Sequence, residues 1–168
     1  MAGLEIDIKF NKSLTKDLDD SYGVNVGWFQ DSKYKDDLPV AQVARWQEFG
    51  TKAGIPRRPF MSMTWMAHEK DWEEKLKTIV QRALDEDKDL DKALAKFGEI
   101  VKSDIQDMIM SGNFVRNSPI TVKGGWIRRK GGKPYYVQGK GFDKPLIDTG
   151  VMIASIQGRT DKEMLDNV

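Results

Sequence analysis

Alternation of apolar and polar residues marks two strands near the amino terminus. One stretch runs from Leu4 to Phe10 and another from Tyr22 to Trp28, and in each every second side chain is apolar. A period of two places one face of a strand on a core and the other face in water. We expect both strands in one small antiparallel sheet, with a short helix over residues 13–20 between them.

Helical spacing of apolar residues follows further along the chain. The first such helix is expected from Val40 to Gly50, where glycine ends it, with Asp36 or Asp37 as its cap. A short helix from Val151 to Ile156 is expected after the tripeptide Asp148-Thr149-Gly150, with Asp148 or Thr149 as its cap. The residues after it, 157–168, are expected to fray.

The two longest helices are predicted over residues 65–83 and 90–108, where apolar residues recur at amphipathic spacing. An acidic run at residues 85–91 separates them. We expect Asp89 to cap the second helix of the pair and Gly112 to end it.

Length and composition indicate one globular domain. The chain has 168 residues, which is about one domain, so we expect a single α+β domain in which the small sheet packs against the two long helices. A charged fraction of 32% and the lack of an apolar run of roughly 18 residues speak against a membrane protein. The chain has no cysteine and one histidine, His68, which is expected at the surface or half-buried. We predict no catalytic residue, no metal ligand and no cofactor.

Residues 45–61, RWQEFGTKAGIPRRPFM, combine charge with residues that restrict the backbone. Pro56 and Pro59 exclude helix across this segment because proline has no backbone donor and favours extended geometry in its predecessor. We expect an extended arm here. The alternative is a connector folded over its own subunit, with Phe60 in the local core.

Residues 113–145 are basic and rich in glycine, without a sustained period, and are expected to form a long loop. From position 116 to position 144 there are eight basic residues and one acidic residue, a net charge of +7, whereas the whole chain carries +1. Aromatic side chains among cations are typical of protein interfaces, and this is the interpretation that we favour. The two alternatives are contact with nucleic acid and disorder. The candidate residues are Arg116, Lys123, Trp126, Arg128, Arg129, Lys130, Lys133, Tyr135, Tyr136 and Lys140.

The tripeptide Asp148-Thr149-Gly150 is similar to that of aspartic proteases, which set one such carboxylate against its twin. In those enzymes it opens a long run of strands, whereas 18 residues follow Gly150 here. A protease that uses Asp148 is therefore the least favoured function.

Five stretches in order carry a resemblance to a known family: VGWF at 26–29, VARWQEFGT at 43–51, IPRRPFM at 55–61, NSPIT at 117–121 and KPLIDTGVMIASI at 144–156. Together they resemble the neck and tail-completion proteins of long-tailed bacteriophages, the group with the lambda-like minor tail protein Z and the virion morphogenesis proteins. Met152 stands where the family has leucine, and the loop around Trp126 is peculiar to this chain.

The resemblance implies a structural α+β subunit without turnover, made and assembled in the bacterial host cytoplasm and placed at the head–tail junction of the virion. Its implied partners are copies of itself in a cyclic hexamer or dodecamer, a head-closure or connector protein, and a tail terminator or tail tube protein, with passing contact to packaged DNA. In such a ring the arm would reach the next subunit. The expected interface residues are Trp46, Glu48, Phe49, Gly50, Pro56, Arg57, Arg58, Pro59, Phe60 and Met61.

Overall fold

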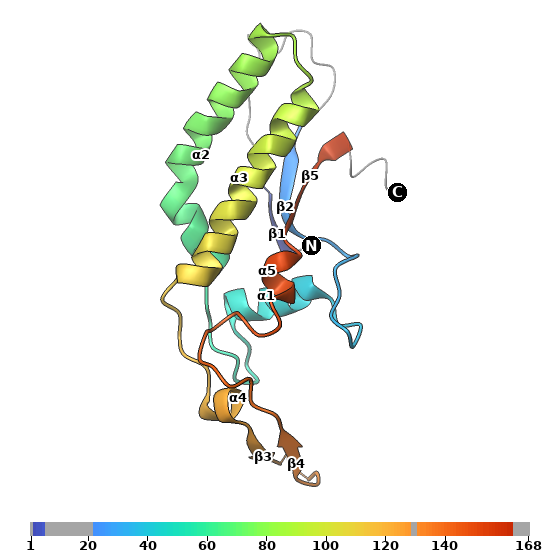
Figure 1. The fold of residues 1–168 in the computed structure, drawn as a ribbon, viewed down its shortest axis with the longest axis vertical. Coiled ribbons are helices and arrows are strands. Elements are labelled where there is room, and N and C mark those ends of the chain that lie inside the picture. Colours follow the sequence, from blue (N-terminus) through green and yellow to red (C-terminus); the bar gives the residue numbers. More distant parts are fainter. Residues whose placement is uncertain (1, 6–21, 129–130, 163–168) are drawn as a thin grey trace.

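The computed structural model describes residues 2–5, 22–128 and 131–162, and these form an α+β fold. The elements in chain order are β1 (Ala2–Glu5), β2 (Val24–Trp28), α1 (Val40–Phe49), α2 (Phe60–Asp85), α3 (Leu90–Ser111), α4 (Pro119–Lys123), β3 (Gly125–Ile127), β4 (Tyr135–Val137), α5 (Val151–Ala154) and β5 (Gln157–Thr160). Figure 1 shows an elongated molecule, with the turn between α2 and α3 at one end and the β3–β4 hairpin at the other.

A three-stranded antiparallel sheet, in the order β1-β2-β5, packs against α3. Val24, Val26 and Trp28 of the central strand are buried, which confirms the strand that alternation predicts there. Only Leu4 and Glu5 of the first predicted strand are described, and both belong to β1. The rest of that strand and the predicted helix at 13–20 lie outside the described residues.

β5 corrects the expectation that the chain frays after Ile156. Val24 pairs with Thr160 and Val26 with Gly158, and the side chain of Thr160 is buried. The short segment has little apolar character of its own, so its order comes from backbone pairing with β2, which sequence periodicity does not reveal. Residues 163–168 lie outside the described part of the chain.

The helical hairpin of α2 and α3 agrees with the prediction, including the break between them. The Asp89 carboxylate accepts hydrogen bonds from the backbone nitrogens of Asp91 (3.0 Å) and Lys92 (3.4 Å), as a helix cap does. α3 is followed by Gly112, as expected, while α2 begins at Phe60, five residues before the amphipathic pattern becomes visible at position 65.

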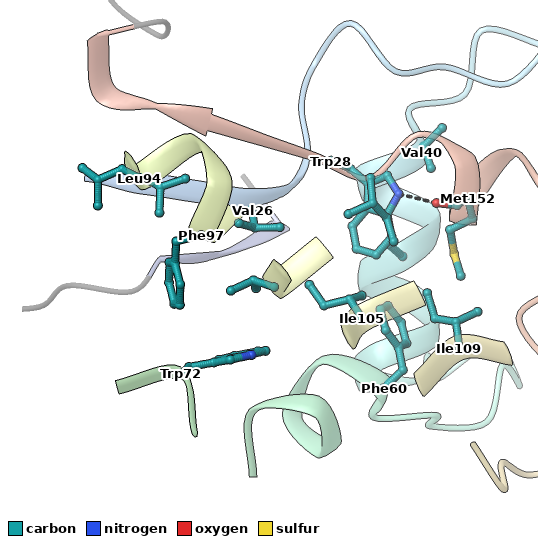
Figure 2. Close-up of a cluster of buried hydrophobic side chains, with 14 of the residues drawn as sticks. Val26, Trp28, Val40, Phe60, Trp72, Leu94, Phe97, Ile105, Ile109 and Met152 are labelled. Carbon is teal, nitrogen blue, oxygen red and sulfur yellow. Dashed lines mark hydrogen bonds between the residues drawn. The ribbon is translucent and has the colours of Figure 1, made fainter. Parts of the chain in front are cut away.

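The main core lies between the sheet, α2 and α3, with contributions from α1 and α5 (Figure 2). The rings of Trp28 and Phe60 meet edge to face, with centroids 5.7 Å apart. Trp28 Nε1 donates to the carbonyl oxygen of Met152 at 2.7 Å, which fixes α5 against the sheet. Each large apolar side chain buried in this way contributes about 1.5–3 kcal/mol.

Two glycines allow α3 to rest directly on the sheet. A Cβ added at Gly98 would lie 2.9 Å from Cγ2 of Val24, and one added at Gly158 would lie 3.2 Å from the Cα of Gly98. A side chain at Gly98 would require Val24 or the helix to move, and one at Gly158 would require a shift of a few tenths of an ångström.

The segment 113–145, hereafter the limb, is more ordered than the predicted loop. Ser118 caps α4 by accepting from Thr121 N at 3.3 Å, and Pro119 occupies the first turn. β3 and β4 pair as a hairpin, which we call the distal hairpin. The predicted loop missed these elements because each is too short to show a period, and their order lies in local caps and pairing.

Two predicted helix caps are wrong. No side chain caps α1, whose preceding residue is Pro39, and the Asp37 carboxylate instead accepts from Lys33 Nζ at 2.8 Å. No side chain caps α5 either, because the position before it is Gly150 in the left-handed conformation, with φ of 77°. Asp148 and Thr149, the two predicted caps, are both exposed and lie two positions and one position before Gly150.

Candidate assembly surface

The connector between α1 and α2 is fastened to its own subunit by Glu48. This side chain is 5% exposed, and its two oxygens accept from Met61 N (2.8 Å), Ser62 N (3.1 Å) and Ser62 Oγ (2.5 Å). The two backbone nitrogens belong to the first turn of α2, where N–H groups have no partner within the helix and the helix dipole favours a negative charge. Glu48 therefore caps α2 from α1 and fixes the angle between the two helices.

Arg58 ties the connector to both α1 and the limb. Its guanidinium donates from Nη1 to Gln47 Oε1 (2.6 Å) and from Nε to the carbonyl oxygen of Val115 (2.8 Å). Nη2 lies 3.3 Å from the carbonyl oxygen of Arg116 and 3.4 Å from Asn117 Oδ1. The residue is 5% exposed, and burial lowers its pKa against the opposing effect of a nearby carboxylate, yet an arginine remains charged.

The turn between these two anchors is compact. Thr51 N donates to the carbonyl oxygen of Ile55 at 2.9 Å, and Ile55 N donates back to Thr51 Oγ1 at 3.2 Å. Gly50 has φ of 72°, and a Cβ there would lie 3.0 Å from the carbonyl oxygen of Ile55. The turn can close this tightly only with glycine at that position.

The expected interface residues of the connector divide into three groups. Phe60 is 0% exposed, and Arg58 and Glu48 bond within the chain, so for these three the geometry is that of the internal connector, the alternative reading. Phe49 is 67% exposed and Arg57 is exposed, so both are available to another molecule. The intermediate positions are Trp46, Gly50, Pro56, Pro59 and Met61.

The limb presents aromatic side chains on the distal hairpin. Trp126 is 72% exposed and pairs across the strands with Tyr136, which is also exposed. Their rings lie edge to face with centroids 5.7 Å apart. Tyr135 and Phe142 are further exposed aromatics of the limb. Large aromatics exposed together are uncommon on isolated domains and mark interaction surfaces.

The limb also exposes cations. Among the predicted basic residues, Arg116, Lys123, Arg128 and Lys133 are exposed, and Arg128 Nε donates to the carbonyl oxygen of Gly132 at 3.0 Å across the turn. Arg129 and Lys130 lie outside the described residues.

Lys140 differs from the other basic residues because it faces inward. Its Nζ donates to the carbonyl oxygens of Lys144 and Ile147 and lies 4.8 Å from the ring centre of Phe142. Burial lowers its pKa, while the charge of Asp148 acts in the opposite direction. Lys140 therefore stabilises residues 142–147, where the limb rejoins the body, and its role is structural.

A cavity of about 350 Å³ opens where the limb meets α1 and α5. We call it the α1–α5 pocket, and its walls include Tyr34, Asp36, Val43, Lys140, Leu146 and Asp148. Burial raises the pKa of Tyr34, and the negative charges of Asp148 and Asp36 raise it further. The pocket is thus partly apolar, with two exposed carboxylates among its lining residues.

Three polar residues at this junction were not predicted: Gln47, Asn117 and Asp143. Oδ1 of Asp143 accepts from both N and Nδ2 of Asn117, each at 3.0 Å, and its other oxygen lies 3.6 Å from Nε of Arg116. The signal for Asp143 was its position as the one acidic residue in the basic stretch. Gln47 and Asn117 each stand inside one of the stretches that carry the family resemblance.

His68 is half-buried, as expected. Its ring stacks on Trp72, and its Nδ1 lies 3.8 Å from Asp104 Oδ2, which also accepts from Trp72 Nε1 at 2.7 Å. Within residues 2–5, 22–128 and 131–162 there is no cluster of three or more acidic, histidine or cysteine side chains suited to a metal ion. Over the same ranges, no helix has the length and apolarity to cross a bilayer.

No protein-family model, no curated protein and no solved structure matches this chain significantly.

Proposed function

We propose that this chain is a structural subunit of a tailed-phage virion, assembled as a ring at the head–tail junction, where it completes the tail or joins it to the head. In this role it binds other protein subunits and carries out no reaction. The proposal starts from the ordered motifs that resemble the neck and tail-completion family.

One observation carries the proposal: four of the five motif stretches, scattered along the sequence, meet at a single place in the fold. Arg58 of IPRRPFM bonds to Gln47 of VARWQEFGT and approaches Asn117 of NSPIT. The α1–α5 pocket is lined by residues from VARWQEFGT, NSPIT and KPLIDTGVMIASI. Unrelated chance matches would not be expected to contact one another in the fold. Their contact therefore supports the interpretation of these motifs as one functional unit.

The shape of that unit suits a ring subunit. The motifs build the joint from which the limb extends beyond the body formed by the sheet, α2 and α3 (Figure 1). A limb that is anchored at its base and exposes aromatics and cations at its end has the composition of a docking element. A stiff joint lowers the ordering cost of docking.

Genetic removal tests the proposal. Cells infected with a phage that lacks this chain should accumulate filled heads and separate tails, and supplying the chain from a plasmid should restore joined particles. Joined, infectious particles that lack the chain would refute the proposal.

Contact with nucleic acid is the second candidate, because exposed cations and stacked aromatics also bind single strands. An oligonucleotide titration distinguishes it. Binding through phosphates weakens steeply with log salt concentration, whereas apolar docking between proteins does not.

A further inference from the structure

The distal hairpin and the α1–α5 pocket are two surfaces of one chain that the fold holds apart. In Figure 1 the hairpin points away from α1 and α5, so the hairpin of a molecule does not reach its own pocket. We infer that the distal hairpin of one copy docks into the α1–α5 pocket of a second copy. This rests on the proposed ring of identical subunits and names the contact that joins them.

The hairpin offers an aromatic face that its own chain leaves open. Trp126 and Tyr136 are cross-strand partners on one face, and they are 72% and 56% exposed. A two-stranded hairpin alone is marginally stable, so contact with a partner would also order it. A tryptophan or tyrosine that docks removes about 150–250 Å² from water, which makes such residues the usual anchors of interfaces.

The pocket matches this face in size and surface character. At about 350 Å³ it is within the range of roughly 300–1,000 Å³ that receives small ligands, so an aromatic side chain has room. Val43, Leu146 and Met152 supply apolar contact. Lys140, the cation among the lining residues, already donates to two backbone carbonyls.

Charge complementarity selects a second copy as the occupant. The pocket is lined by the exposed carboxylates of Asp36 and Asp148. Beside the hairpin aromatics, Lys123, Arg128 and Lys133 are exposed and positive. Opposite charges that flank an apolar anchor steer two surfaces together and fix their register.

Because hairpin and pocket are unlike surfaces, the contact is heterologous. Each copy that docks its hairpin keeps a free pocket for the next copy. Repetition of such a contact gives a ring when the rotation closes.

Mixing of two half-defective variants tests this directly. Trp126→Ala impairs the hairpin, and Thr149→Arg obstructs the pocket at an exposed lining position. In sedimentation, each variant alone should associate at least tenfold more weakly than the unaltered chain. An equimolar mixture should regain dimers and stop there. Met66→Ala, which alters an 80% exposed side chain on α2, should associate like the unaltered chain.

Photo-crosslinking gives the position of the contact without depending on the fold of those variants. With benzoylphenylalanine at Tyr136, in a mixture of ¹⁴N- and ¹⁵N-labelled chains, crosslinked peptides should be isotopically mixed and map to residues 34–47 or 146–152. Crosslinks within one chain, crosslinks to α2 or α3, or an absence of crosslinks would overturn the inference. The inference would also be overturned if the chain did not self-associate but bound an oligonucleotide through Trp126.

These outcomes separate the inference from the proposed function. If the mixture fails to regain dimers but the chain is found at the head–tail junction, the hairpin–pocket contact is wrong and the ring subunit stands. If the predicted crosslinks form but phages lacking the chain assemble normally, the contact stands and the virion function is wrong.

Discussion

The two adjacent arginines of the connector provide a matched pair for a stability test. The family resemblance led us to expect both at an interface with a neighbouring subunit, whereas in the structure Arg58 is buried in its own chain and Arg57 is exposed. Arg58→Ala removes a guanidinium that bonds to Gln47 and to the carbonyl oxygen of Val115. Arg57→Ala, the matched control, removes the same type of side chain from the adjacent, exposed position.

The expected magnitude follows from those contacts. Hydrogen bonds to a charged group contribute about 1.5–3 kcal/mol each, and buried acceptors left without a donor add a cost, while removal of the buried charge itself gives some energy back. We therefore expect Arg58→Ala to lower the free energy of unfolding by about 2–4 kcal/mol. For a chain of this length that corresponds to roughly 4–16 °C in Tm. Arg57→Ala should stay within about 0.5 kcal/mol.

Urea unfolding followed by tryptophan fluorescence measures both variants, and amide hydrogen exchange locates the effect. Exchange should quicken in residues 113–124, where the limb loses its anchor, before it does in α3. Arg58→Lys should recover little, because one ammonium cannot reproduce the fork of donors. Equal stability of the Arg57 and Arg58 variants would refute the anchoring role, as would a loss for Arg58→Ala below about 0.5 kcal/mol.

Further predictions concern the body of the molecule. Glu48→Ala should cost about 2–3 kcal/mol in urea unfolding, since it removes the cap of α2, and a loss under about 0.5 kcal/mol would contradict that role. Gly98→Ala should destabilise by about 1–3 kcal/mol despite the better helix propensity of alanine, because the methyl group meets the sheet; a gain in Tm would refute the close packing. Trp72→Phe should cost about 1–3 kcal/mol through the lost indole bond to α3, and unchanged stability would argue against that bond. The pKa of Tyr34 is raised by burial, so its contribution is present below about pH 10, the unfolded value, and is lost as pH rises through the folded pKa. Tyr34→Phe should therefore lose less stability than the unaltered chain above that pH, and parallel losses would contradict the shift.

The elements that could be predicted from the sequence are those in which a periodic pattern of apolar residues continues without interruption. The α2–α3 hairpin follows from apolar spacing over many turns, and Asp89 between the two patterns identifies the cap. β2 follows from its strict alternation. In these cases local propensity and tertiary burial favour the same structure, so one sequence pattern suffices.

The parts that escaped prediction depend on contacts between distant residues. β5 has order because β2 lies beside it, and the base of the limb has order because Arg58 donates to it across more than fifty positions. Two adjacent arginines in a proline-containing segment predict exposed side chains, because arginine is rarely buried without partners. Only the structure reveals that one arginine of the pair has such partners, and the same applies to Glu48.

The central claim is that copies of this chain form a closed ring at the head–tail junction of a phage particle. An electron-microscopic reconstruction of that junction, at a resolution that separates helices, measures it most directly. We expect one ring of copies, each with its α2–α3 hairpin in the body and its distal hairpin inserted beside α1 and α5 of the next copy. If a phage encodes this chain and the head–tail junction of its particles contains no density for it, the central claim is contradicted.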